Sequence, residues 1–196
     1  MRRGNLFIVS GPSGAGKGTL VKEMLGRVPD VWVSISVTTR RPRPGEEDGR
    51  EYFFLTDEEF DALLASGGLL EWAEVHGNRY GTPRAEVERR VAQGKQVILE
   101  IDPQGAMQVK DLEPDSVLVF VTAPSMEELR RRLEARGSES EEQVRLRLTN
   151  AELELLFAEE YGHVVINDDV ARAADELAAI IDSCADRPID ENRRKR

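Results

Sequence analysis

Five short apolar runs recur along the chain, each of a length suited to one buried strand. They cover residues 6–10, 31–37, 96–101, 117–121 and 164–166. Continuous apolar runs of this length are typical of strands covered on both faces, as in a parallel sheet. Most stretches between them have helical patterns, and alternating strands and helices indicate βαβ units. The pattern predicts an α/β fold with a parallel sheet flanked by helices.

Capping residues predict where several helices begin and end. Thr82 followed by Pro83 predicts an N-cap and a first helical residue, and Gly94 predicts the end of that helix. Three further helix starts carry a Ser or Thr followed three residues later by Glu or Gln, the pattern of a capping box: Thr56, Ser125 and Ser140.

Two stretches interrupt the alternation of strands and helices. Residues 38–81 are rich in proline and glycine and contain extended pieces at 51–55 and 69–75, which predicts an inserted α+β lobe. Residues 125–147 have a helical pattern dense in charges of both signs, which predicts a second, helical insertion.

Composition narrows the class of protein. The chain has 196 residues and a net charge of -10, the wrong sign for a protein that holds a nucleic-acid backbone. We find neither a run of roughly 20 apolar residues that could span a bilayer nor the apolar core of a signal peptide, so a cytoplasmic location without membrane contact is expected. A single cysteine and two histidines predict no internal disulfide and no protein-built metal site.

Residues 11–19 read GPSGAGKGT and follow the first predicted strand directly. Glycines in such a loop let successive amides point inward, the following helix adds the positive end of its dipole, and Lys17 can reach the outer phosphates of a nucleotide. The alternative is a glycine-rich turn without a ligand. Gly18 stands where the usual motif has the Ser or Thr that binds Mg²⁺, and Thr19 follows it, so we expect Mg²⁺ to be held mainly by water and the nucleotide phosphates.

Acidic residues end the third predicted strand. Asp102 could orient metal-bound water or a substrate hydroxyl, or serve as the N-cap of the next helix, and the two roles are compatible. Glu100, two residues earlier, faces the same side of the strand.

Several motifs in a fixed order carry a family resemblance. They are SISVTTRRPRPGE at 34–46, GREYFF at 49–54, LEWA at 70–73, GNRYGT at 77–82 and IDPQG at 101–105. Together with the loop at 11–19 they resemble the guanylate kinase family over residues 6 to about 181. The resemblance implies a P-loop kinase that transfers the γ-phosphoryl group of ATP to GMP with Mg²⁺, in purine nucleotide metabolism and GMP recycling. It leaves open whether the protein is a monomer or a homo-oligomer.

The resemblance also implies a division of the single domain, residues 1–196. The core is expected at 1–37, 82–124 and 148–185, a GMP-binding lobe at 38–81, a lid over ATP at 125–147 and a flexible tail at 186–196.

The resemblance implies three groups of site residues. Residues expected to bind GMP are Ser36, Arg40, Arg43, Tyr52, Glu71, Tyr80, Thr82 and Asp102. Residues expected to bind ATP are Gly11, Pro12, Ser13, Gly14, Ala15, Gly16, Lys17, Gly18, Thr19, Arg136 and Asn167. Residues expected to be catalytic are Lys17, Arg40, Arg132 and Arg147, and of these Arg132 and Arg147 are expected at the transferring phosphoryl group.

Several of these residues also fit purely structural roles. Arg40, Arg41 and Arg43 could form local ion pairs with the acidic residues 46–48. Tyr52 and Tyr80 could be half-buried sheet residues, Glu71 a surface strand residue and Asn167 the N-cap of the last helix. For function, the alternatives are a catalytically silent binding module of the same family and a monophosphate kinase that prefers another base.

Overall fold

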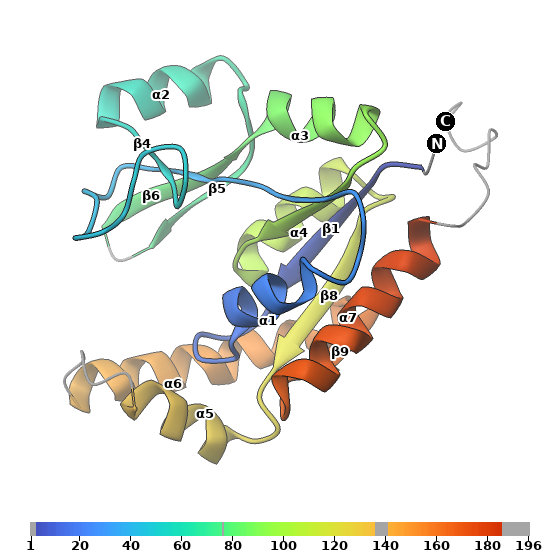
Figure 1. Ribbon diagram of the computed structural model, residues 1–196. Helices are drawn as coiled ribbons and strands as arrows, with labels where there is room; N and C mark the ends of the chain where they lie inside the picture. The colour runs from blue at the N-terminus through green and yellow to red at the C-terminus, as the bar shows by residue number, and fades with distance from the viewer. Residues whose placement is uncertain (1–2, 76, 136–140, 186–196) are drawn as a thin grey trace.

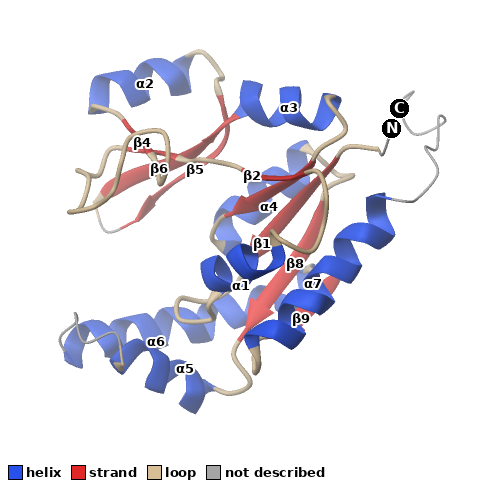
Figure 2. Cartoon of the chain, viewed as in Figure 1, coloured by secondary structure: helices blue, strands red, loops and turns tan. Residues whose placement is uncertain are grey.

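A parallel sheet forms the centre of the computed structural model, which describes residues 3–75, 77–135 and 141–185. Five strands pair in the order β2-β7-β1-β8-β9, with all neighbours parallel (Figure 2). They are β1 (Asn5–Ser10), β2 (Val31–Val33), β7 (Gln96–Glu100), β8 (Val117–Thr122) and β9 (His163–Ile166). The predicted α/β fold is confirmed.

Helices cover both faces of this sheet, because alternate side chains of each buried strand point to opposite faces. Phe7 and Val9 pack beneath α1 (Lys17–Met24) and α7 (Val170–Ala185). Leu6 and Ile8 pack on the other face. The elements on that side are α3 (Arg84–Ala92), α4 (Pro103–Leu112) and the 3-10 helix η1 (Leu156–Glu160) (Figure 1). Within the described ranges no helix is long and apolar enough to cross a bilayer.

A second, smaller sheet builds the inserted lobe. Its strands pair in the order β4-β3-β6-β5. They are β3 (Val37–Thr38), β4 (Phe53–Phe54), β5 (Leu69–Val75) and β6 (Asn78–Pro83), and α2 (Asp57–Ala65) packs on them. Val37, Phe60 and Leu69 form the core of this lobe. The lobe projects from the same end of the central sheet as the lid helices (Figure 1).

Two boundary predictions at the edges of this lobe are wrong. The apolar run at 31–37 is not one strand, because β2 ends at Val33 and the chain crosses to the second sheet before Val37. Thr82 is not a helix cap, because Thr82 and Pro83 still pair with β5 and the next helix begins at Arg84. The hydrophobicity of residues 31–37 does not indicate where the chain leaves one sheet and enters another.

The second insertion is a pair of packed helices, α5 (Met126–Glu134) and α6 (Glu141–Leu155). Leu129 and Leu133 of α5 meet Val144 and Leu148 of α6 in a separate small core. Helix α6 continues unbroken past residue 147, so the structure marks no boundary where the predicted lid ends.

The capping residues behave differently at three predicted helix starts. Thr56 and Glu59 make both bonds of the capping box, which confirms that prediction. Ser125 accepts from the amide of Glu128, but the Glu128 carboxylate pairs with two arginines of its own helix, so only half of that box forms. Ser140 and the predicted tail at 186–196 lie outside the described residues.

Candidate active site

The phosphate-binding loop joins β1 to α1 at the carboxyl end of the central sheet. Gly11, Gly14 and Gly16 have φ values of 138°, 89° and 86°, which residues with a Cβ rarely adopt. A Cβ on Gly11 would lie 2.0 Å from the carbonyl oxygen of Val121. The glycines are therefore required for the shape of the loop.

A pocket of about 280 Å³ lies against this loop. It is lined by Pro12, Ser13, Gly14, Gly16, Lys17, Gly18, Thr19 and Glu100. Lys17 begins α1, and its ammonium donates to the carbonyls of Gly11 and Pro12. Most residues predicted to bind ATP therefore surround one space, at the end of a helix where anions are favoured.

Asn167 supports the loop from behind. The side-chain amide of Asn167 donates to the Ala15 backbone carbonyl at 2.8 Å. The backbone carbonyl of Asn167 accepts from the Arg132 guanidinium at 2.8 Å. It is not the cap of α7, because Asp169 accepts from the amide of Arg172 there. The capping alternative for Asn167 is wrong, and its expected contact with adenine stays a prediction.

The lid helices touch the loop at two further points. Arg132 of α5 is held by Glu128 at 2.7 Å and reaches the back of the loop. Arg147 of α6 donates to the Ser13 hydroxyl at 3.0 Å. Both arginines predicted at the transferring phosphoryl group thus lie beside the phosphate loop, whereas Arg136 lies outside the described residues.

Glu154 is a loop contact that the sequence did not reveal. It lies two helical turns after Arg147 on α6, where the Ser13 amide and the Lys17 charge both act on its carboxyl. Burial raises the pKa of its carboxyl, while the charge of Lys17 opposes that rise. A lone glutamate on an amphipathic helix gives no sequence signal of such a contact.

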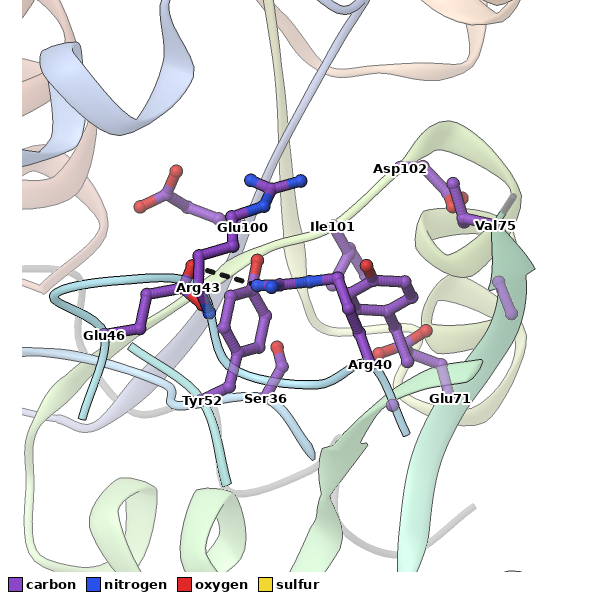
Figure 3. Close-up of a pocket in the computed structure, with 13 residues that line it drawn as sticks. Ser36, Arg40, Arg43, Glu46, Tyr52, Glu71, Val75, Glu100, Ile101 and Asp102 are labelled. Carbon is purple, nitrogen blue, oxygen red and sulfur yellow. Dashed lines mark hydrogen bonds and ion pairs between the residues drawn. The ribbon is translucent and has the colours of Figure 1, made fainter. Parts of the chain in front are cut away.

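A second cavity, of about 290 Å³, opens between the lobe and the core (Figure 3). All residues predicted to bind GMP line it except Thr82: Ser36, Arg40, Arg43, Tyr52, Glu71, Tyr80 and Asp102. The structure thus brings together side chains spread over 67 sequence positions, from 36 to 102.

One end of this cavity is cationic and phenolic. Arg40 pairs with Glu46 at 2.9 Å and lies over the ring of Tyr52, 5.4 Å from its centroid. The rings of Tyr52 and Tyr80 meet edge to face, with centroids 5.9 Å apart. Arg43 donates its backbone amide to the same Glu46 carboxylate at 2.7 Å. The local ion pair considered as an alternative is therefore present for Arg40, and it lies inside the cavity.

The other end holds a buried carboxylate. Glu71 is 6% exposed, so it is not a surface strand residue, and its Oε1 accepts from the Thr82 hydroxyl at 2.6 Å. Burial raises the pKa of the Glu71 carboxyl to about 7, the Thr82 bond lowers it, and nearby Asp102 raises it further. Asp102 caps α4 by accepting from the Gly105 amide at 2.8 Å, as predicted.

Glu100 borders both cavities. It ends β7, pairs in register with Val9 of β1, and lines the loop pocket as well as the second cavity. Burial raises the pKa of its carboxyl, and the Lys17 charge opposes this. Asp102 does not line the loop pocket, whereas Glu100 does, so the expected contact of Asp102 with metal-bound water stays a prediction. The alternation of side chains along a strand predicts the face toward which Glu100 points, but it does not predict the role of Glu100.

Comparison with known proteins supports one family. The sequence profile described as guanylate kinase matches residues 3–184. The chain belongs to the guanylate kinase family. It is 54% identical over 176 residues to the guanylate kinase of Thermobifida fusca (strain YX), covering 90% of each chain. It is 52% identical over 181 residues to that of Rubrobacter xylanophilus, covering 92% of this chain and 95% of the relative.

Solved structures agree with this assignment. The crystal structure of guanylate kinase from Anaplasma phagocytophilum superposes with a TM-score of 0.79 at 35% identity, covering 95% of this chain and 90% of that one. Shikimate kinase from Bacteroides thetaiotaomicron gives a TM-score of 0.52 at 15% identity, which shows a shared fold alone. The chain therefore has the fold of P-loop kinases and the family membership of guanylate kinases.

Proposed function

We propose that this chain is an ATP:GMP phosphotransferase, which moves the γ-phosphoryl group of ATP to GMP and releases ADP and GDP. The observation that carries this function is the second cavity, which has a buried carboxylate at one end and arginines with phenols at the other, beside a phosphate loop. Relatives of about half identity are named guanylate kinases.

Base selection is assigned to Glu71. Guanine presents its ring N1–H and its exocyclic amine as adjacent donors, and one ionised carboxylate accepts from both. Adenine offers no such pair, so it would leave a buried carboxylate without a partner, which is costly. Thr82 holds Oε1 and thereby sets the direction of the carboxylate. Ser36, which lines the same cavity, is suited to donate to the guanine carbonyl.

The GMP phosphate belongs at the cationic end. Arg40 and Arg43 supply guanidinium groups, which suit a phosphate dianion, and Tyr52 and Tyr80 supply phenolic donors. Glu46 already occupies this end as an anionic partner of Arg40. The incoming phosphate would displace that carboxylate, so the ion pair keeps the arginine oriented before the substrate binds.

Phosphoryl transfer needs positioning and charge neutralisation more than covalent chemistry. Lys17 and the loop amides would hold the ATP phosphates, and Arg132 and Arg147 would neutralise charge on the transferring group. Mg²⁺, when bound, would supply further neutralisation of the phosphate charge. The residues at the loop fit this role: Glu100 offers a half-buried carboxylate at the pocket, with Oε2 3.4 Å from where a Cβ on Gly18 would stand, and the remaining ligands would be water and phosphate.

The lobe at 38–81 and the lid at 125–147 are proposed to close over the two nucleotides. Both project from the end of the sheet where the phosphate loop lies (Figure 1). Closure would exclude water, which otherwise competes with GMP for the transferred group.

An assay of ADP release tests this function. The purified chain receives ATP and Mg²⁺ with GMP, AMP, CMP or UMP supplied separately. Turnover with GMP in clear excess over the other three is expected. Preference for another base would contradict the role of Glu71, and GMP binding without turnover would point to a silent binding module.

A further inference from the structure

Helix α4 lies directly against the carboxylate that reads the base. A Cβ built on Gly105 would stand 2.7 Å from Glu71 Oε2 and 3.4 Å from its carboxyl carbon. A Cβ carbon, which cannot donate a hydrogen bond, does not approach a carboxylate oxygen that closely unless one of the two is displaced. Glu71 therefore occupies space that is open only because residue 105 has no side chain.

Helix α4 also holds the strand that carries Glu71. The Gln108 side chain accepts from the Trp72 amide at 3.3 Å and donates to the Trp72 carbonyl at 3.1 Å. It thus bonds both backbone groups of the residue next to Glu71. Ala106 and Val109 pack in the core against the central sheet, which fixes α4 there. Helix α4 therefore fixes the position of Glu71 relative to the central sheet.

We propose that Gly105 and Gln108 are positioning residues for guanine selection, in which α4 sets the place of the Glu71 carboxylate from the core side. This inference rests on the proposed function, because it assumes that Glu71 meets the base. It adds two residues, outside the lobe that carries Glu71, to the determinants of base choice.

Substitution at Gly105 separates this role from folding. Gly105 sits in a helix without positive φ, so alanine fits the backbone and favours the helix. The helix is fixed by its buried neighbours, whereas the Glu71 carboxylate is a side-chain end, so the carboxylate must yield. Its other oxygen is tied to Thr82, so any shift also disturbs that bond.

The experiment compares Gly105→Ala with Gly26→Ala, since a Cβ on Gly26 would meet nothing within 4 Å and its φ is not positive. Steady-state kinetics are measured with GMP and with inosine monophosphate, which keeps the ring N–H of guanine and lacks its amine. For Gly105→Ala we expect KM for GMP to rise about 10- to 100-fold and the preference for GMP over inosine monophosphate to shrink. KM for ATP and the melting temperature of Gly105→Ala should be about the same as those of the Gly26→Ala control, because distant sites usually behave independently.

A second pair of variants keeps the inference testable if Gly105→Ala does not fold. Gln108→Ala removes both bonds to Trp72, and Gln104→Ala changes another exposed glutamine of the same helix. Gln108→Ala should raise KM for GMP and reduce the preference over inosine monophosphate, and Gln104→Ala should do neither.

Failure of the inference and failure of the function give different results. A wild-type chain that does not turn over GMP contradicts the function before any variant is made. A wild-type chain active on GMP, with a folded Gly105→Ala variant that keeps the KM and the base preference of Gly26→Ala, overturns the role of α4. If Gly105→Ala is unfolded, equal kinetics for Gln108→Ala and Gln104→Ala overturn it instead.

Discussion

The Glu71 carboxyl is held in its unliganded site at a pKa of about 7, because burial disfavours its charge. Binding of guanine requires the ionised form, since a protonated carboxyl cannot accept from both donors. The residue that confers selectivity is therefore destabilising while the cavity holds no base. Such a conflict between stability and function is common at binding sites.

Neutralising Glu71 should stabilise the unliganded protein in a pH-dependent way. Between pH 4.5 and about 7 the folded protein keeps a proton on Glu71 that the unfolded chain releases, so this carboxyl costs stability as pH rises. Glu71→Gln removes that cost, which is about 3 kcal/mol at most. We expect its melting temperature to exceed that of wild type at pH 8.5 and to match it near pH 5. The exposed Glu74→Gln on the same strand is the control, and an equal difference at both pH values would argue against the account.

The same ionisation should appear in GMP binding. As pH falls below 7, the ionised fraction of Glu71 in the free enzyme drops about tenfold per unit, so KM for GMP should rise as pH falls. The GMP phosphate titrates near pH 6 and adds its own slope. Kinetics from pH 6 to 8.5 with wild type and Glu71→Gln separate the two effects, because only the wild type should show the contribution of the carboxyl. Identical profiles would exclude Glu71 as the titrating group.

Among the secondary-structure elements, α6 links the lid to the phosphate loop. Arg147 donates a hydrogen bond to the Ser13 hydroxyl, and the Glu154 carboxyl is influenced by the Ser13 amide. Movement of α6 would therefore change its contacts with the phosphate loop, which is consistent with a segment proposed to close over ATP.

The charge of Arg147 should matter far more than that of its neighbour Arg145. Both lie on α6, but Arg145 is exposed and Arg147 reaches the loop. We expect Arg147→Ala to lower kcat by roughly 100-fold or more, as loss of a transition-state contact does, with a wild-type melting temperature. Arg145→Ala should stay near wild type. Equal kcat values for the two variants would remove Arg147 from the transfer step.

Much of this arrangement of elements could be predicted from the sequence. Residues 97–99 and 117–121 are apolar throughout, and the runs predicted around them form parallel strands as expected. The split of 31–37 between two sheets could not be predicted, because Val33 and Val37 look alike to any measure of hydrophobicity. Strand β6 could not be predicted either, because its Gly and Pro residues resemble a loop, and only pairing with β5 makes it a strand.

The site also has one part that the sequence predicts and one part that it does not. The phosphate loop has a local sequence signature, and family motifs indicate the residues of the second cavity. The roles of Glu100, Gly105 and Glu154 depend on which segments meet in space. No local pattern records that a glycine on α4 faces a glutamate more than thirty residues earlier.

Across the whole molecule, the two cavities open at one end of the parallel sheet, with Glu100 between them. Residues that follow β1 and residues at the carboxyl end of β7 line these cavities, as is usual for ligand sites in open α/β sheets. This placement allows a phosphoryl group to pass directly from one cavity to the other.

Phosphorus NMR of the reaction mixture distinguishes direct transfer from hydrolysis. With ATP, Mg²⁺ and GMP, the signals of ADP and GDP should grow at equal rates while inorganic phosphate stays at background. Lys17→Ala should abolish both signals while keeping a folded circular dichroism spectrum. Growth of ADP with inorganic phosphate and without GDP would rule out direct transfer, since it would show that ATP is cleaved by water and that GMP is not the acceptor.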